Sequence, residues 1–410
     1  MKTILIIEYF RFGREYLLRS KRLGLRTVLA TQKDAEDIKE EDRKNIDHLI
    51  RITKESDKDI ALQIIENCMQ EKIDGVLAGH VGLVPLAAMI ADMLELPSFG
   101  TNAAYECAYK NLSRKRMEKE GFFKHSYYEI NSIQDILNIH EELKYPLIIK
   151  PIDGFSSINV QKVDNYNELL LAYSKHTENR KYLPLSKEFS ETVLIESYFT
   201  GKEYSVESIV ENGTVHIITI TDKQKDPDAP FVESGHIIPA FTLTNNQEDK
   251  VKEFVRKMHK IFNVQNGLTH TEVIVNHNEI DLIEINPRLG GGYIGEVLGK
   301  AFNIDMYEIA VKNALGMKNY IPETPVCCAF VGFAIAKKTG KLLAIGGIEK
   351  VKNQPNIEWV KKCHSIFNEI SSTVDNRARI CAFLGSTTLN DKKIFEKMEN
   401  IAQLIEVSIE

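Results

Sequence analysis

The segment from residue 271 to residue 292, TEVIVNHNEIDLIEINPRLGGG, constrains the fold of this chain more than any other. Two apolar runs flank the short polar stretch 276–278, a pattern typical of antiparallel strands joined by a tight turn. If the turn is centred on Asn278, Glu272 lies directly opposite Glu284. The Cβ atoms of opposed residues are about 5 Å apart, so these two carboxylates repel unless a cation neutralises them.

Asn286 adds an amide oxygen to this pair of carboxylates. Side chains alternate along a strand, so Glu284 and Asn286 are expected to share a face with Leu282, and the isoleucines beside Glu284 to point the other way. Oxygen-only ligation suits Mg²⁺ or Mn²⁺, with phosphate oxygens and water completing the shell. The sequence therefore predicts a divalent-metal site at Glu272, Glu284 and Asn286.

An exposed polar stripe on the sheet is the simpler alternative for this hairpin. It does not explain why apolar residues flank both carboxylates, or why Pro287, Arg288 and three glycines follow at once. An arginine beside a metal–phosphate site stabilises charge that develops on a transferring phosphoryl group or an acyl phosphate. Glycines at 290–292 let a ligand approach the backbone closely. The functional interpretation is therefore favoured.

The 410 residues are too many for one ordinary core, so two or three structural units are expected. The first hundred residues alternate short apolar runs with amphipathic stretches, which predicts a mostly parallel, doubly wound sheet. Its first strand-to-helix junction, EYFRFGRE, lacks the GxGxxG of a dinucleotide fold and disfavours a nicotinamide-dependent oxidoreductase. The expected strands are 3–7, 26–30, 48–52 and 75–78, and the expected helices are 13–23, 57–70 and 84–94.

Beyond residue 100 the pattern changes twice. A helix rich in Lys and Arg (110–120) and an apolar strand (147–150) come first, and an antiparallel sheet is expected over 191–290. The tail alternates apolar and polar stretches and reads as a small α+β unit. The predicted units are an N-terminal α/β domain (1–100), two central subdomains (101–190 and 191–324) and a C-terminal unit packed on them (325–410).

Composition argues against nucleic acid and membrane as partners. The net charge of −6 gives no electrostatic case for nucleic acid. No apolar stretch approaches the roughly 18 residues needed to span a membrane. The six cysteines are scattered without a CxxC, as expected of reduced thiols in a cytoplasmic protein.

A second group of residues suits nucleotide phosphates. Lys150 ends the apolar strand PLIIK and precedes the loop 153–157, DGFSS. A lysine there can reach a phosphate as a point charge, while small residues such as Ser156 expose backbone N–H groups. The loop has a single glycine, Gly154, and is therefore expected to be stiff.

The order of these pieces resembles the ATP-grasp superfamily of carboxylate–amine ligases. Lys110 lies in YKNLSR, Lys150 ends its strand, LIESYFTGKEYSVE occupies 194–207 and EINPRLGGG occupies 284–292. The resemblance covers essentially the whole chain. It implies an ATP-grasp fold of α/β and α+β parts with an N-terminal Rossmann-like domain, and ATP with Mg²⁺ or Mn²⁺ as cofactors.

The resemblance also implies a role for each matching residue. Lys110 and Lys150 would contact the ATP phosphates, the backbone of Glu196, Tyr198 and Phe199 the adenine edge, and Glu203 the ribose hydroxyls. Glu272, Glu284 and Asn286 would ligate metal, and Arg288 would stabilise the acyl-phosphate transition state.

Within the superfamily, GLTHTE together with FVESGHIIPA (231–240) is similar to amino-acid and dipeptide ligases. Glu233 and His236 then resemble substrate-site residues near the reacting carboxylate or amine. The alternative for His236 is a core histidine satisfied by a backbone carbonyl. His270 is expected to be structural and to orient Glu272.

The implied reaction activates a carboxylate, expected to be an amino acid, as an acyl phosphate and joins it to an amine, releasing ADP and phosphate. Both substrates are small molecules, and a homodimer is compatible with the resemblance. Three alternatives stay open: a ligase of a purine-type or natural-product pathway, a biotin-carboxylase-like enzyme, and a non-catalytic nucleotide-binding module. Arg288 disfavours the last, because a pure binder needs no acyl-phosphate arginine.

Overall fold

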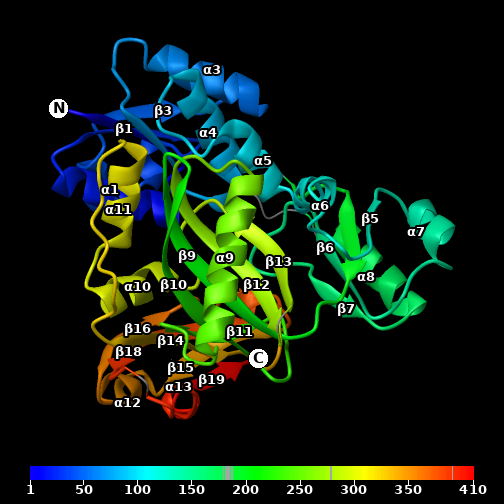
Figure 1. Cartoon of the computed structure of the whole chain (residues 1–410). Helices are drawn as coiled ribbons and strands as arrows, with labels where there is room; N and C mark the ends of the chain where they lie inside the picture. The colour runs from blue at the N-terminus through cyan, green and yellow to red at the C-terminus, as the bar shows by residue number, and fades with distance from the viewer. Residues whose placement is uncertain (179, 181–184, 186–187, 278, 390) are drawn as a thin grey trace.

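The computed structural model of the chain shows an N-terminal α/β part, a small lobe, and a long sheet that continues into the C-terminal strands (Figure 1). It describes residues 1–178, 180, 185, 188–277, 279–389 and 391–410. Asn278, on which the predicted turn was centred, lies outside these residues. Among the described residues, no helix combines the length and apolar character needed to cross a bilayer.

The N-terminal part is a parallel sheet of four strands in the order β3-β2-β1-β4. Its strands are β1 (Thr3–Ile7), β2 (Arg26–Thr31), β3 (His48–Arg51) and β4 (Gly75–Ala78). Its helices are α1 (Arg11–Arg22), α2 (Glu40–Arg43), α3 (Asp57–Asn67) and α4 (Val84–Met93), with 3₁₀ turns η1 (Ala35–Asp37) and η2 (Val81–Leu83).

Both faces of this sheet are buried, which explains its continuous apolar runs. Ile4 and Ile6 belong to one apolar cluster and Leu5 and Ile7 to another on the opposite face. The doubly wound sheet predicted for the first hundred residues is confirmed.

The small lobe projects to the right of the long sheet (Figure 1) and carries an antiparallel sheet in the order β5-β8-β6-β7. The prediction that residues 193–197 join the antiparallel sheet of 191–290 is wrong, because this strand pairs with β5 and β6 instead. The strands are β5 (Tyr127–Ile130), β6 (Leu147–Pro151), β7 (Gln161–Val163) and β8 (Val193–Ser197). The helices of the lobe are α6 (Lys110–Lys119), α7 (Ile133–Ile139) and α8 (Tyr166–Glu178), and α5 (Thr101–Ala108) precedes them and packs against α4.

The long sheet has eight strands in the order β13-β12-β9-β10-β11-β14-β18-β16. Its central strands are β9 (Lys202–Glu211), β10 (Thr214–Lys225), β11 (Glu233–Ile238), β12 (Gly267–Asn276) and β13 (Glu279–Asn286). Helix α9 (Asn245–Ile261) crosses one face (Figure 1), where Val251, Val255 and Met258 pack in the cluster that contains Val206 and Val273.

Three of the C-terminal strands extend this sheet instead of only packing against it, because β14 pairs with β11, and the other three form a separate sheet in the order β17-β15-β19. This continuity brings the C-terminal segment to the cleft described below. The remaining strands are β14 (Cys328–Ile335), β15 (Gly340–Gly346), β16 (Ile357–Lys362), β17 (Glu369–Ile370), β18 (Arg379–Thr387) and β19 (Glu406–Ile409). The remaining helices are α10 (Ile294–Phe302), α11 (Met306–Ala314), α12 (Ile348–Lys352) and α13 (Ile394–Ala402), with the 3₁₀ turn η3 (Asn376–Ala378).

The predicted hairpin is present, and Glu272 pairs directly with Glu284, but the predicted register is one residue off nearer the turn, where Asn276 pairs with Glu279. The register then shifts, so that Val273 pairs with Leu282, which leaves Ile283 as an extra residue in β13. Because of this bulge, Leu282 packs in the same apolar cluster as Ile285, and Ile283 lines a cleft beside Glu284. The expectation that Glu284 shares a face with Leu282 and not with Ile283 is therefore wrong.

We expect Phe262→Ala to lower the free energy of unfolding by about 3–5 kcal/mol, because it empties a large site in the cluster beneath α9. Phe262 is 1% exposed. Leu171→Ala, at a position that is 57% exposed on α8, is the control and should change stability by less than about 0.5 kcal/mol. Urea denaturation measures both, and equal effects would contradict this account of the core.

Candidate active site

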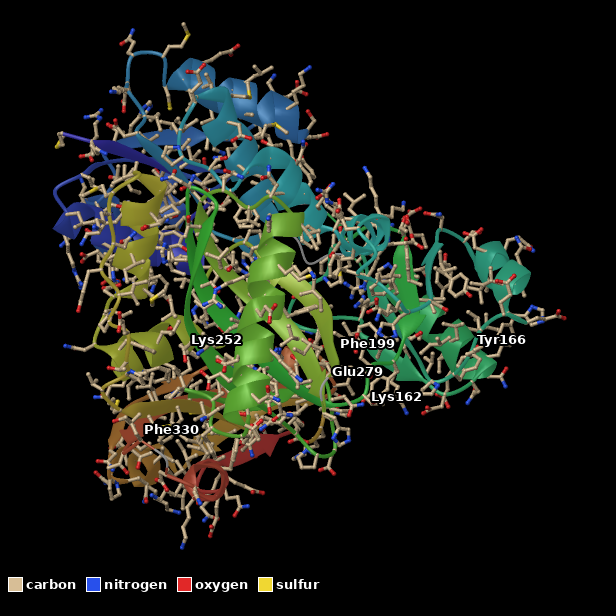
Figure 2. The ribbon with its side chains drawn as sticks, in the orientation of Figure 1. Lys162, Tyr166, Phe199, Lys252, Glu279 and Phe330 are labelled. Carbon is tan, nitrogen blue, oxygen red and sulfur yellow. The ribbon has the colours of Figure 1, made fainter. Side chains whose placement is uncertain are left out.

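A cleft that is open to solvent lies between the small lobe, the long sheet and the C-terminal segment. Figure 2 labels Phe199 at the junction of the lobe and the sheet, where the chain leaves β8. Asn286 lines a neighbouring pocket that shares Lys110 and Glu284 with the cleft. Eleven of the predicted site residues line the cleft: Lys110, Lys150, Ser156, Glu196, Tyr198, Phe199, Glu203, Glu233, Glu272, Glu284 and Arg288.

Glu284 is held as a carboxylate by its neighbours. Lys110 Nζ lies 2.9 Å from Glu284 Oε2, and Asn286 Nδ2 donates to Glu284 Oε1 at 2.7 Å. Burial alone would raise the pKa of Glu284, but Lys110 and Asn286 outweigh it and lower that pKa to about 2. The carboxylate opposite Glu272 is therefore ionised at neutral pH.

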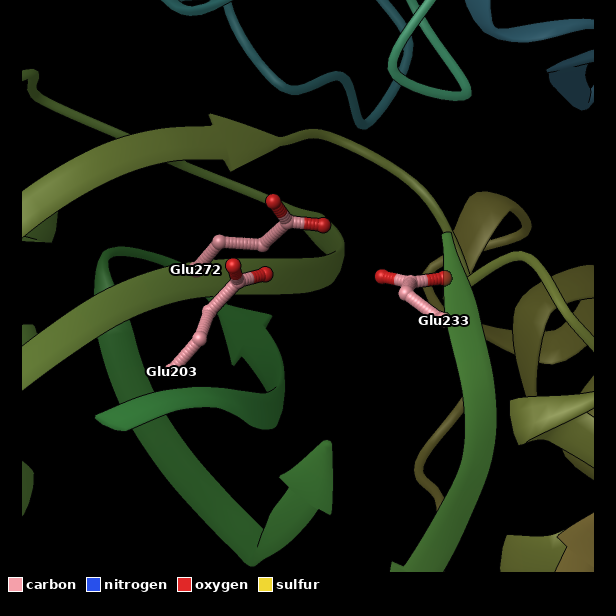
Figure 3. Close-up of side chains that lie close together, drawn as sticks. All are labelled: Glu203, Glu233 and Glu272. Carbon is pink, nitrogen blue, oxygen red and sulfur yellow. The ribbon is translucent and has the colours of Figure 1, made fainter. Parts of the chain in front are cut away.

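Glu272 belongs to a second group, in which three carboxylates from β9, β11 and β12 converge (Figure 3). The buried Lys223 lies among them: its Nζ contacts Glu203 and is 2.6 Å from Glu233 and 3.1 Å from Glu272. Burial lowers the pKa of Lys223, but the three carboxylates raise it well above its usual value. The cation at the centre of this acidic group is therefore an ammonium of the chain itself.

His270 holds Glu272 from the other side. One ring nitrogen lies 2.9 Å from Glu207 Oε1 and the other 3.0 Å from Glu272 Oε1. Burial lowers the pKa of His270, but the two carboxylates raise it to about 9, so both ring N–H groups donate. This contact agrees with the expectation that His270 orients Glu272.

The lysine expected at the phosphates belongs to a buried ion-pair group. Lys150 Nζ contacts Glu196, and Arg114 binds both oxygens of Glu196 at 2.7 and 3.2 Å. Burial lowers the pKa of Lys150 to about 8 despite Glu196, whereas Arg114 and Lys150 overcome burial and lower the pKa of Glu196 to about 2. Arg114 also donates to the carbonyl of Ile283, at the bulge, at 3.0 Å.

The loop after Lys150 takes an unusual backbone shape. Ser156, Ser157 and Asn159 have φ angles of 56°, 58° and 57°, in the left-handed region that non-glycine residues rarely adopt. The N–H of Asn376, in η3, lies 3.4 Å from the carbonyl of Ser156. The loop therefore contacts the C-terminal segment across the cleft.

Arg288 is buried beside the metal-type residues. It donates to the carbonyl of Leu289 at 2.6 Å and to Asn286 Oδ1 at 3.2 Å. Its Nε is buried and has no hydrogen-bond partner among the described residues. A donor with unused capacity thus remains at the position predicted to stabilise a developing charge.

Glu233 and His236, the two residues predicted to lie near the substrate, differ in whether they reach the cleft. Glu233 lines the cleft, but His236 lies behind it, 1% exposed and 3.7 Å from Glu233. Neither ring nitrogen of His236 has a hydrogen-bond partner within the described part of the chain, so the alternative of a backbone carbonyl partner finds no support. Burial lowers its pKa to about 3, which keeps the imidazole neutral.

Four residues of this site escaped the sequence reasoning: Lys223, Arg114, Asn376 and Arg379. Lys223 carries no clear local signal, because the burial of its neighbours Thr221 and Asp222 is seen only in the structure. Asn376 and Arg379 carry no local signal and reach the cleft only through the C-terminal strands.

Comparison with known proteins identifies the fold and the arrangement. Residues 143–296 match the ATP-grasp domain, and residues 19–98 match the ATP-grasp N-terminal domain. This chain belongs to the ATP-grasp superfamily. The predicted ATP-grasp fold with an N-terminal α/β domain is thereby confirmed.

One curated relative and two solved structures show what this ATP-grasp protein is similar to. The alanine–anticapsin ligase of Bacillus amyloliquefaciens is 24% identical over 268 residues, which cover 62% of this chain and 56% of that protein. The L-amino acid ligase from Bacillus licheniformis has a TM-score of 0.81 at 20% identity, covering 100% of this chain and 99% of that one. The biotin carboxylase domain of Hydrogenobacter thermophilus 2-oxoglutarate carboxylase, solved with MgADP and bicarbonate, has a TM-score of 0.71 at 17% identity, covering 100% and 91%.

The three similarities support different conclusions about this chain. The two structural likenesses are below 25% identity and show the shared ATP-grasp fold. The chain spans about half the length of the curated relatives that it matches first, 56% in each case.

The pKa of Lys150 predicts a pH dependence for nucleotide binding by this ATP-grasp protein. The ammonium is present below about pH 8 and is lost as the pH rises through that value. We expect the affinity for ATP to fall by up to about tenfold per pH unit above pH 8, measured by calorimetry. Lys150→Arg stays charged and should flatten this profile; the same decline in that variant would contradict the assignment.

Proposed function

We propose that this chain is an ATP-dependent ligase that activates a carboxylate as an acyl phosphate and joins it to an amine, giving ADP and phosphate. The observation that carries this proposal is the meeting of Glu272, Glu284 and Arg288 with Lys110 and Lys150 in one cleft. Phosphoryl transfer asks mainly for positioning and charge neutralisation, which these residues supply without a nucleophilic side chain.

The residues of the cleft fit a nucleotide with a divalent cation. Glu272 and Glu284 offer carboxylate oxygens with lowered pKa values, as Mg²⁺ or Mn²⁺ requires. The Asn286 amide would have to turn its oxygen, which Arg288 binds in this structure, toward the cation. When bound, the cation would neutralise the β- and γ-phosphates. Lys110 and Lys150 would bind phosphate oxygens, the backbone of residues 196–199 the adenine edge, and Glu203 the ribose.

The chain's own residues would then act on the substrates in order. A carboxylate oxygen attacks the γ-phosphorus and ADP leaves; the amine then attacks the activated carbonyl and phosphate leaves, with the amine proton passing to solvent. The unpaired Nε of Arg288 would stabilise the charge that develops on the transferring group. The loop that contains Ser156 would exclude water from the acyl phosphate.

The acid is proposed to be an amino acid, because relatives over much of the chain are named for ligating amino acids. A phosphate-release screen over pairs of amino acids tests this proposal, and no release with any pair would overturn it. Bicarbonate-dependent ATP turnover with free biotin would instead favour a biotin-carboxylase-like enzyme, the reaction class suggested by another structural relative. A cytoplasmic location and a homodimer stay predictions.

Glu284→Gln should lower Mg²⁺-dependent ADP release by at least about 100-fold, because it removes one of the two opposed carboxylates. Glu279→Gln is the matched control: Glu279 is exposed on the same strand, as labelled in Figure 2, and its loss should leave the rate unchanged. Full activity of the Glu284 variant, with circular dichroism equal to that of the unaltered chain, would contradict the assignment of Glu284 as a metal ligand.

Arg288→Ala should reduce kcat by about 100- to 1000-fold while changing the KM for ATP only a few-fold, because the guanidinium acts on charge that appears in the transition state. Steady-state kinetics at saturating acid and amine separate the two constants. A rise in KM with an unchanged kcat would show instead that Arg288 only binds the ground state.

A further inference from the structure

The C-terminal segment contributes a rigid turn to the wall of the cleft. Asp375 accepts hydrogen bonds from the backbone N–H of Arg377 at 2.9 Å and from Ser372 Oγ at 2.8 Å, which fixes η3. The turn presents Asn376 and Arg379, both of which line the cleft. The ATP-directed lysines come from the small lobe, whereas this turn leads into β18 of the long sheet.

Both residues of the turn hold Glu233. Arg379 Nη2 donates to Glu233 Oε2 at 2.6 Å and Nε to the Glu233 carbonyl at 3.0 Å, and Asn376 Nδ2 donates to Oε2 at 3.2 Å. Burial raises the pKa of Glu233, but Lys223 and Arg379 lower it well below its usual value. A carboxylate this acidic is a poor proton acceptor, so Glu233 serves to position the two cations.

Within the described part of the chain, the guanidinium of Arg379 retains one free hydrogen-bond donor. Its Cζ lies 3.9 Å from the centre of the Phe333 ring, and its Nε and Nη2 are used by Glu233. Its Nη1 has no hydrogen-bond partner among the described residues and faces the backbone of Gly292, where a Cβ would lie 3.1 Å from it. A Cβ at the neighbouring Gly291 would meet no atom within 4 Å, so the space beside Gly291 is open.

We propose that Arg379 binds a carboxylate on the amine substrate, which makes it a specificity-determining residue. This inference rests on the proposed ligase function. Arg288, Lys110 and Lys150 account for the phosphates, and Arg379 is a further fixed cation in the same cleft with an open donor. A fixed guanidinium that is already oriented by Glu233 loses little freedom on binding a carboxylate. The amine substrate is thus of the amino-acid class and not a simple amine.

Gly292 keeps this donor accessible. Its φ of +58° disfavours any side chain, and a Cβ there would also lie 2.6 Å from His236 Nε2. The backbone can therefore approach Arg379 closely without a side chain filling the space.

The phosphate-release screen first identifies an active pair of amino acids. The test then compares the amino acid that supplies the amine with its α-amide. The unaltered chain should show a KM for the amide about 10- to 100-fold higher than for the acid, because the amide lacks the charge. Arg379→Gln should raise the KM for the acid to that of the amide, with the KM for ATP unchanged. Arg256→Gln, which removes an exposed arginine of α9, is the control and should keep the preference.

Each outcome decides one question. No ADP release with any pair of amino acids in the unaltered chain overturns the proposal that the substrates are amino acids. Release with equal KM values for acid and amide overturns only the role of Arg379, and this comparison needs no variant to fold. An equal loss of kcat with both amines in Arg379→Gln would show that Arg379 only supports Glu233. Arg379→Lys keeps the positive charge but not the planar guanidinium, and it should restore part of the preference for the acid over the amide.

Discussion

Glu272 and Glu284 face each other across a hairpin in a buried cleft, and two carboxylates so close repel unless positive charge lies beside them. The chain supplies that charge from three directions. Lys110 comes from α6 in the small lobe, Lys223 from β10, and His270 from the same strand as Glu272. Lys110 and Lys223 tie α6 and β10 to the hairpin, so the position of the lobe relative to the sheet depends on this balance.

The same balance explains why the site needs several parts of the chain. Arg114 joins Glu196 on the lobe to the bulge at Ile283 on the sheet. Asn376, from the C-terminal segment, lies between Glu233 and the loop that carries Ser156. The cleft is therefore walled by segments that are distant in sequence, and it exists only where the continuous sheet places them together.

Local patterns were enough to predict the strands of the N-terminal sheet, because alternation and turn residues act over a few positions. The pairing of Glu272 with Glu284 was predicted from a register that is one residue off beside the turn, where Asn276 pairs with Glu279, and the bulge at Ile283 offsets that error. Local patterns could not predict the bulge at Ile283, which adds one residue without changing the apolar pattern and turns Leu282 into the core. Arg379 was also beyond local reasoning, since its partner Glu233 lies far away in sequence and only the pairing of distant strands brings them together. The roles of the individual site residues remain proposals.

The central claim is that a carboxylate is activated by transfer of the γ-phosphoryl group of ATP. The most direct test labels the acid substrate with ¹⁸O in the carboxylate that is activated. Mass spectrometry of the released phosphate then follows the isotope. The account predicts one ¹⁸O atom in each phosphate, because the attacking carboxylate oxygen leaves with the phosphoryl group. Unlabelled phosphate, or label recovered in AMP, would contradict it.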